Sequence, residues 1–208
     1  MPWVSPTTTV EAALSGHLYD VLLADVPIGY WRLGEISGTQ AADSSGNARH
    51  GTYTGGPTLD RAGCLGPFSD RAADFDGTDD YVTMGDISAF EFTGAFAVSF
   101  WLRVTSNPGV EQRVLGKTSG TTGWCVNLTT GGKIRFYGRN SGDTADAFNF
   151  LSAATVTGGS WVHVACTWDG TTTAAKVIIY VNGASNATAT STTTTLSTSG
   201  VAAFQLAA

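Results

Sequence analysis

The residues best suited to chemistry are aspartates, and several of them gather in one turn. Four aspartates fall within residues 74–80, and Asp43 lies with Asn47 in a second turn-rich segment. Carboxylate and amide oxygens are the ligands that calcium prefers, in sets of about six to eight. The sequence therefore allows a calcium site that uses Asp43, Asp76 and Asp79. The spacing does not match an EF-hand loop, and it favours the alternative that these side chains hold tight turns together by bonding the backbone.

A second group of residues could bind a ligand through surface contacts. The candidates are Tyr137, Arg139, Asn140, Phe148 and Asn149. They lie in or next to the predicted strands 133–138 and 147–152, where aromatic rings beside amide and guanidinium groups suit a sugar. The alternative is that the aromatic rings pack in the interior, which is the commoner fate of any single large apolar ring.

The charge of the chain excludes one class of partner. Its 208 residues carry 17 acidic and 11 basic side chains, which gives a formal net charge of −6. The basic residues are scattered along the sequence, whereas nucleic-acid binding needs a basic stripe. We therefore expect no nucleic-acid partner. The three cysteines have no metal-binding spacing, and we expect free thiols rather than a disulfide framework.

The N-terminal region is expected to stand apart from the main domain. Residues 1–8 form a polar, proline-containing arm with no signal-peptide pattern, and no segment is long and apolar enough for membrane insertion. Residues 9–25 follow a capping box with apolar side chains at helical spacing, and Pro27 ends the predicted helix. The predicted domains are therefore 1–27, an arm with an amphipathic helix, and 28–208, the main domain.

The main domain shows the alternation of short β-strands. Phe96, Val98 and Phe100 would face one side of a strand, and turn signals such as Asn182-Gly183 separate the predicted strands. This alternation buries one face of each strand and is typical of antiparallel sheets. The predicted fold is all-β, a two-sheet antiparallel jelly-roll sandwich with one N-terminal helix.

Short motifs follow one another in a recognisable order within residues 28–183. They are Tyr30-Trp31-Arg32-Leu33-Gly34-Glu35, Asp43-Ser44-Ser45-Gly46-Asn47, His50-Gly51, Phe75-Asp76-Gly77-Thr78-Asp79-Asp80-Tyr81-Val82, Phe100-Trp101-Leu102-Arg103, Arg113-Val114-Leu115-Gly116-Lys117, Trp161-Val162-His163-Val164-Ala165-Cys166-Thr167-Trp168-Asp169-Gly170 and Tyr180-Val181-Asn182-Gly183. The ordered set resembles the laminin-G/pentraxin-like branch of the concanavalin A-like lectin and glucanase superfamily. The resemblance implies a concanavalin A-like sandwich that holds a ligand, with calcium on loops at its rim in many members.

The end of the chain departs from the pattern of that family. Members usually close with a strand that carries an Ile-Asp-Glu-like segment, which the residues up to Ala208 do not contain. We expect the last strand to be missing or supplied by another chain, which would leave an open sheet edge. An open edge invites pairing with other chains. The expected contacts with neighbouring subunits of a larger assembly are therefore residues 1–27 and the C-terminal edge.

No catalytic residue is predicted. The glucanase branch of the family places its carboxylates on one strand, and retaining hydrolysis needs two of them about 5 Å apart. The glutamates of this chain are isolated from one another: Glu11, Glu35, Glu91 and Glu111. His163 alternates with Trp161 and Ala165 on a predicted strand, which indicates a structural role. We expect the protein not to be an enzyme.

The leading hypothesis is a non-catalytic, lectin-like structural or adhesive module of a virion. Residues 19–33 resemble the start of lectin-like modules in bacteriophage capsid decoration and minor tail proteins. Such a protein would be made in the host cytoplasm, reside in the virion and could bind surface glycans. The alternative is a secreted bacterial carbohydrate-binding or adhesion module. A glucanase-like glycoside hydrolase is disfavoured by the missing carboxylates.

Overall fold

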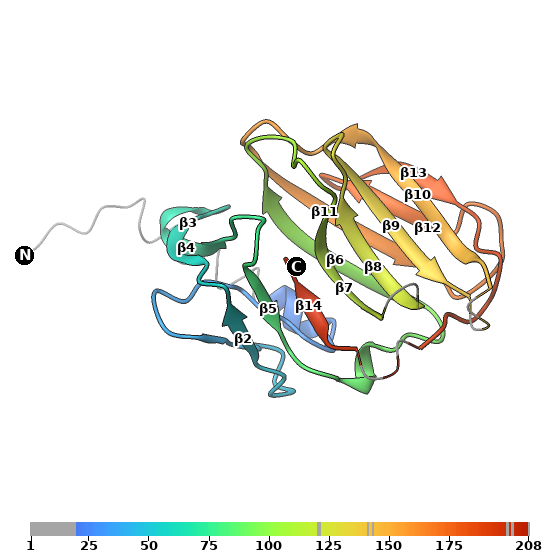
Figure 1. The fold of residues 1–208 in the computed structure, drawn as a ribbon, viewed down its shortest axis with the longest axis horizontal. Helices are drawn as coiled ribbons and strands as arrows, with labels where there is room; N and C mark the ends of the chain where they lie inside the picture. The colour runs from blue at the N-terminus through green and yellow to red at the C-terminus, as the bar shows by residue number, and fades with distance from the viewer. Residues whose placement is uncertain are drawn as a thin grey trace, which may run out of the picture. The chain divides into compact units, whose positions relative to one another are not determined.

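The chain divides into two compact units, Met1–Met84 and Gly85–Ala208 (Figure 1). A computed structural model describes residues 20–119, 122–140, 142, 144–198, 200 and 202–207. The predicted arm 1–8 and most of the predicted helix 9–25 lie outside these residues. The predicted division at residues 27 and 28 stays a prediction.

The first unit begins with a short helix and continues into small antiparallel sheets. Residues 20–24 are helical, which confirms the last turn of the predicted helix. Val26 then has a φ of 50°, outside the helical region, and the following Pro27 disfavours helical geometry at this position. The strands of the unit are β1 (Gln40–Ala41), β2 (Gly51–Thr54), β3 (Thr58–Gly63), β4 (Gly66–Asp74) and β5 (Tyr81–Thr83). They pair antiparallel as β1–β2, β2–β5 and β3–β4.

The alternation that begins at Ile28 predicts a strand over residues 28–33, but no strand forms there. Trp31 makes only an isolated bridge with Asp43, and the backbone N–H of Tyr30 donates to the Asp43 carboxylate at 3.0 Å. The indole N–H of Trp31 donates to the carbonyl of Arg49 at 2.9 Å. Side-chain hydrogen bonds therefore take the place of a strand ladder in this segment.

The second unit is a sandwich of two antiparallel sheets (Figure 1). The larger sheet has the order β14 (Phe204–Leu206), β7 (Gln112–Ser119), β8 (Thr122–Leu128), β9 (Lys133–Arg139) and β10 (Asp146–Thr155). The smaller sheet has the order β13 (Ala184–Ala189), β12 (Val177–Val181), β11 (Trp161–Trp168) and β6 (Phe96–Arg103). A 3₁₀ turn, η1 (Ser88–Phe90), precedes β6. The predicted all-β antiparallel sandwich with one short helix is confirmed.

Aromatic side chains fill the space between the two sheets of the second unit. The ring of Phe96 from β6 lies 5.0 Å from Trp124 and 5.8 Å from Phe136 of the larger sheet, measured between ring centroids. Phe148 from β10 reaches Trp168 of β11 at 5.8 Å. Strand alternation directs these rings inward, so the residues between them in sequence point outward.

The inner side of β7 carries a cation that is completely buried. Lys117 has no exposed surface, and its Nζ lies 2.7 Å from a carboxylate oxygen of Asp86 and 2.7 Å from one of Glu91. Burial alone would lower the pKa of Lys117, but the hydrogen bonds and charges of the two carboxylates raise it above its ordinary value. The ion pairs therefore tie the segment before β6 to the larger sheet.

The expectation of a missing closing strand is wrong. Phe204–Leu206 form β14, which pairs antiparallel with β7. The alternation of alanine and threonine before it predicts a strand over 187–195, but β13 ends at Ala189. Hydroxyl groups hold the stretch instead: Ser197 Oγ accepts from the N–H of Gly123 at 2.9 Å, and Thr192 donates to the carbonyl of Asp146 at 3.0 Å.

Candidate functional site

Polar side chains occupy the outer face of the larger sheet in the second unit. On β8 and β9 the side chains of Trp124, Val126 and Phe136 are buried, so the residues that alternate with them face away from the smaller sheet. We call this surface the arginine face. Its residues are Arg113, Gly116 and Thr118 of β7, Cys125 and Asn127 of β8, Arg135, Tyr137 and Arg139 of β9, Asp146 and Asn149 of β10, Gln205 of β14, and Glu111 just before β7.

Strand register arranges the arginine face in cross-strand rows. Arg113 lies opposite Asn127, which lies opposite Arg135. The next row runs from Gly116 through Cys125 and Tyr137 to Asn149. Directly opposed residues on neighbouring antiparallel strands have side chains on the same face. A row of small side chains on β7 and β8 therefore lies next to the row that carries two arginines.

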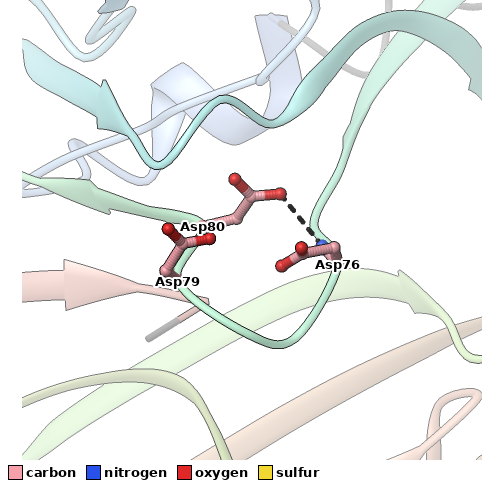
Figure 2. Close-up of side chains that lie close together, drawn as sticks. All are labelled: Asp76, Asp79 and Asp80. Atoms are coloured by element: carbon pink, nitrogen blue, oxygen red, sulfur yellow. Dashed lines mark hydrogen bonds between the residues drawn. The ribbon is translucent and has the colours of Figure 1, made fainter.

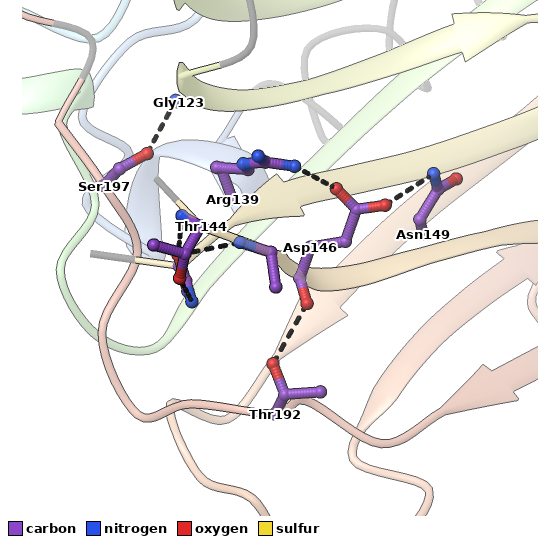
Figure 3. A network of polar contacts seen from close by, with 9 residues as sticks. Gly123, Arg139, Thr144, Asp146, Asn149, Thr192 and Ser197 are labelled. Carbon is purple, nitrogen blue, oxygen red and sulfur yellow. Dashed lines mark hydrogen bonds and ion pairs between the residues drawn. The ribbon is translucent and has the colours of Figure 1, made fainter. Parts of the chain in front are cut away.

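One end of the arginine face is organised by Asp146 (Figure 3). Its Oδ1 accepts from the guanidinium of Arg139 at 3.0 Å, and its Oδ2 accepts from the amide of Asn149 at 3.0 Å. The backbone carbonyl of the same residue accepts from the hydroxyl of Thr192. The side chains of Arg139 and Asn149 are thus both held by one carboxylate.

The other end of the face is organised around Glu111, Gln205 and Thr118. Glu111 lies 3.1 Å from the guanidinium of Arg135 and accepts from the amide of Asn127 at 2.7 Å. The guanidinium of Arg113 donates to Gln205 at 2.9 Å and to Thr118 at 2.7 Å. Arg113 is therefore held by two neutral oxygens, whereas Arg135 is held by a carboxylate.

The predicted ligand residues have different positions. Tyr137, Arg139 and Asn149 share the arginine face. Asn140 holds the following loop instead: its Oδ1 accepts from the backbone N–H of Thr144 at 3.0 Å. Phe148 is 3% exposed and lies in the core, 4.7 Å from the ring of Phe136, so it cannot belong to the same surface.

The tyrosine and the cysteine of the arginine face are neutral. Burial, assisted by the charge of Asp146, raises the pKa of Tyr137 above its ordinary value. Burial is also the main cause that raises the pKa of the Cys125 thiol to about 11. Both groups therefore keep their protons at neutral pH, and the tyrosine hydroxyl can donate a hydrogen bond.

The arginine face differs in charge from the first unit. The first unit has 11 acidic and four basic residues, and the second has six acidic and seven basic residues, which gives formal net charges of −7 and +1. The basic residues are scattered in sequence, yet β-strand pairing brings Arg113, Arg135 and Arg139 to one face. This clustering could not be predicted from the sequence, because it depends on which strands are neighbours in the sheet.

A group of three carboxylates in the first unit could hold a metal ion. Carboxylate oxygens of Asp76, Asp79 and Asp80 all lie within 4.8 Å of one another (Figure 2). The same turn has its own hydrogen bonds: Asp80 Oδ2 accepts from the N–H of Asp76 at 3.0 Å, and Asp76 Oδ1 accepts from the N–H of Thr78 at 2.8 Å. The structure thus groups two of the predicted calcium ligands, Asp76 and Asp79, with Asp80.

Asp43, the third predicted calcium ligand, is not part of that group. Its carboxylate accepts hydrogen bonds from the backbone of Tyr30, Ser45 and Arg49 and from the Ser45 hydroxyl, all between 2.9 and 3.0 Å. Burial would raise the pKa of Asp43, but these hydrogen bonds outweigh it, and the pKa lies below its ordinary value. Asp43 therefore holds the first unit together.

The outer face of the smaller sheet is aromatic and more exposed. Trp101 is 46% exposed, and its ring lies 5.2 Å from that of His163 on the neighbouring strand. The guanidinium of Arg103 lies 5.5 Å from the ring centre of Trp161. Farther along, an open hollow of about 440 Å³ is lined by Ala97, Thr167, Ile178 and their neighbours. This face offers stacking surfaces rather than an ordered polar network.

In the part of the chain that the structure describes, no helix has the length and hydrophobicity to cross a membrane.

Comparisons with known proteins agree with this fold. A family model described as the concanavalin A-like lectin/glucanases superfamily matches residues 76–207. No match is found among curated protein sequences.

Solved structures with similar folds include receptor-binding domains. One is the binding domain of botulinum neurotoxin DC in complex with rat synaptotagmin II, with a TM-score of 0.57 and 12% identity over 88% of this chain and 48% of that one. A second is described as a receptor binding domain, with a TM-score of 0.59 and 15% identity over 90% of this chain and 44% of the other. A third comes from work on botulinum neurotoxin type C, whose cell entry is described as dependent on interaction with two ganglioside molecules. It has a TM-score of 0.53 and 11% identity over 86% of this chain and 47% of that one. The chain thus spans less than half the length of these structures, and the likeness extends to the fold alone.

Proposed function

The chain belongs to the concanavalin A-like lectin/glucanases superfamily, and we propose that it is a non-catalytic, lectin-like module that binds glycans on its arginine face. The observation that carries the proposal is the fixed polar network of β9 and β10, in which Asp146 holds Arg139 and Asn149 beside Tyr137. Ordered donors next to an aromatic ring bind sugar hydroxyls with little loss of conformational entropy.

A binding role suits the carboxylates of this face better than a catalytic one. Glycoside hydrolysis requires a carboxylic acid that gives a proton to the leaving group. On the arginine face, Glu111 and Asp146 are each ion-paired with an arginine. These pairs hold the arginines in place, and we propose that neither carboxylate acts as a general acid.

Binding of the purified full chain to an array of neutral and charged glycans tests the proposal. We expect Tyr137→Ala and Asn149→Ala to weaken binding by about tenfold each, which corresponds to about 1.4 kcal/mol. Trp101→Ala is the control, because it removes a larger and more exposed ring from the other sheet. Binding that depends on Trp101 and not on Tyr137 or Asn149 would contradict the choice of surface, and binding to no glycan would contradict the function.

The module is proposed to work in a virion, as a bacteriophage capsid decoration or minor tail protein. Support for this comes from the resemblance of residues 19–33 to the start of phage lectin-like modules. Attachment to neighbouring subunits is proposed for residues 1–27. The argument for the C-terminal edge rested on a missing last strand, and it no longer applies because β14 is present and pairs with β7. Deleting residues 1–27 should leave the sandwich folded and abolish incorporation into the particle. Normal incorporation of the truncated chain would show that residues 1–27 do not attach it. Absence of the full chain from assembled particles would favour the alternative of a secreted bacterial carbohydrate-binding or adhesion module, which is extracellular.

Calcium is the cofactor proposed for the turn of Asp76, Asp79 and Asp80. Carboxylates are preferred calcium ligands, and a cation would reduce the repulsion between three neighbouring negative charges. Addition of calcium should raise the melting temperature, and Asp79→Asn should remove the rise, because Asp79 makes none of the hydrogen bonds described above within the turn. An unchanged melting temperature would leave these aspartates with the turn-forming role alone.

A further inference from the structure

The charges of the arginine face indicate which class of glycan it would bind. We propose that the face binds an anionic glycan, whose sugar rings carry carboxylate or sulfate groups, and that Arg113 and Arg135 select for these groups. The inference rests on the proposed function, because it names the ligand class of the same surface.

Arg113 is held in place without being neutralised. Its two recorded hydrogen-bond partners, Gln205 and Thr118, are both uncharged. No carboxylate of the described residues forms an ion pair with it, in contrast to the ion pairs of Lys117, Arg135 and Arg139. A guanidinium has five N–H donors in a planar fork, which matches the oxygens of a carboxylate or sulfate. Two of the donors orient Arg113, and its remaining donors and its full charge are left for a ligand.

Arg135 has only part of its hydrogen-bonding capacity used. One of its terminal nitrogens lies 3.1 Å from Glu111, and its side chain is 37% exposed. Its Nε is buried and has no hydrogen-bond partner among the residues that the structure describes. The carboxylate of Glu111 is also shared with Asn127. A second anion can approach the exposed part of the Arg135 side chain, whose charge is balanced by only one shared carboxylate.

The two arginines have a spacing that suits a polysaccharide. They lie in one cross-strand row with Asn127 between them, so their strands are two strand spacings, roughly 10 Å, apart, which is about the length of two sugar rings. The adjoining row contains Gly116 and Cys125, whose small side chains leave room for a chain to lie on the sheet. Tyr137 and Asn149 continue that row with groups that can bond hydroxyls.

The positive charge of the arginine face is local, and it favours a ligand with a few spaced anionic groups. The arginine face has three arginines against two carboxylates, within a chain whose formal net charge is −6. A long nucleic acid would have to approach many phosphates against this overall negative charge, whereas a glycan with spaced acidic groups needs only a local match. The hydroxyl-bonding side chains beside the arginines favour a glycan over an acidic peptide.

The test measures binding of the full chain to four polymers: dextran sulfate, polygalacturonate, neutral dextran and polyglutamate. We expect the two anionic glycans to bind at least about tenfold more tightly than dextran, with an affinity that falls as salt is added. Tight binding of only one of them would identify sulfate or carboxylate as the group selected, and both results support the inference. Equal binding of polyglutamate would overturn the choice of a glycan.

Matched variants separate a specific site from general charge attraction. Arg113→Gln should lose about tenfold in affinity for the anionic glycan, while Arg103→Gln, the same change on the outer face of the smaller sheet, should lose none. Arg113→Lys keeps the charge without the planar fork and should lose less than Arg113→Gln. Equal losses in Arg113→Gln and Arg103→Gln, at unchanged unfolding midpoints, would overturn the inference.

The outcomes also separate this inference from the function on which it rests. If dextran binds as tightly as dextran sulfate and Tyr137→Ala weakens both, the glycan-binding module stands and the anionic ligand is wrong. If no polymer and no neutral glycan binds, both are wrong.

Discussion

The two sides of β7 use positive charge in opposite ways. On the inner side, Lys117 is fully buried and makes ion pairs with Asp86 and Glu91 at 2.7 Å each. On the outer side, Arg113 is half-buried and is held by the neutral side chains of Gln205 and Thr118. A buried charge must be paired to be tolerated, whereas a charge that serves a ligand is best oriented without being neutralised. The comparison indicates that the inner cation stabilises the fold and the outer cation is available for binding.

The largest expected effect comes from removing the inner cation. Lys117→Met leaves the largely buried carboxylate of Glu91 and the half-exposed carboxylate of Asp86 without their counter-ion. We expect a loss of about 2–3 kcal/mol in the free energy of unfolding, because hydrogen bonds to charged groups are lost and one carboxylate stays largely buried. Urea unfolding measures it. Arg113→Gln is the matched change on the outer side and should cost less than about 1 kcal/mol. Similar losses in the two variants would remove the distinction between the two sides of β7.

A second expected effect is a pH dependence of stability that comes from the buried thiol of Cys125 in the arginine face. Because burial raises its pKa to about 11 in the folded state, the folded protein keeps a thiol proton that the unfolded chain loses first. The contribution of this thiol to stability is therefore fully present below its pKa in the unfolded chain. The contribution is lost as pH rises from that value through the pKa of the thiol in the folded protein. The loss at about pH 10 is roughly 1.4 kcal/mol per such thiol, from a factor of 1.36 kcal/mol per unit.

Cys125→Ala isolates this contribution from the other alkaline titrations. The variant should lose less stability than the wild type between neutral and alkaline pH, as measured by urea unfolding at each pH. Cys166, on the inner side of β11, still titrates in the variant, so some loss remains. An identical pH dependence in the two proteins would show that Cys125 is accessible to solvent in the arginine face.

A smaller effect is expected from the carboxylate that competes with a ligand for Arg139. Asp146→Asn removes a partly exposed ion pair and should cost about 1 kcal/mol or less. The asparagine keeps one side-chain oxygen that can accept from Arg139, so the order of Arg139 is retained while one negative charge is removed. Binding of dextran sulfate should therefore strengthen by a few-fold. Weaker binding at unchanged stability would mean that ordering of Arg139 matters more than its charge, against the account given for Arg113.

The smallest effect is expected on the smaller sheet. Trp101 is 46% exposed, and Trp101→Ala should change the free energy of unfolding by about 0.5 kcal/mol or less, as is usual for surface positions. Its glycan affinity should equal that of the wild type. A clear loss of affinity would move the binding surface from the arginine face to the aromatic one.

Local patterns in the sequence were sufficient for much of the fold. Asn182 and Gly183 both have positive φ and connect β12 to β13, as their hairpin signal predicted. Alternation predicts nine core residues, of which four are buried: Trp124, Ile134, Val164 and Ile179. The other five are half-buried: Trp31, Phe75, Phe100, Leu102 and Val181. The predicted strand 28–33 failed because the Asp43 side chain competes for its backbone hydrogen bonds.

The arginine face could be predicted only in part. Alternation along β9 is enough to place Arg135, Tyr137 and Arg139 on one side of a strand, and two of these were among the predicted ligand residues. Arg113 could not be added from the sequence, because its position depends on β7 pairing with β8 and on the register of that pairing. The same limit applies to Phe148, which a bulge in β10 after Asp146 helps to turn into the core.

Nuclear magnetic resonance titration of the full chain with a short sulfated glycan tests the central claim most directly. The account predicts chemical-shift changes concentrated at the arginine face, at the backbone of Gly116, Cys125 and Tyr137 and at the side chains of Arg113 and Arg135. Changes concentrated instead at Trp101, Trp161 and His163 of the smaller sheet would contradict it.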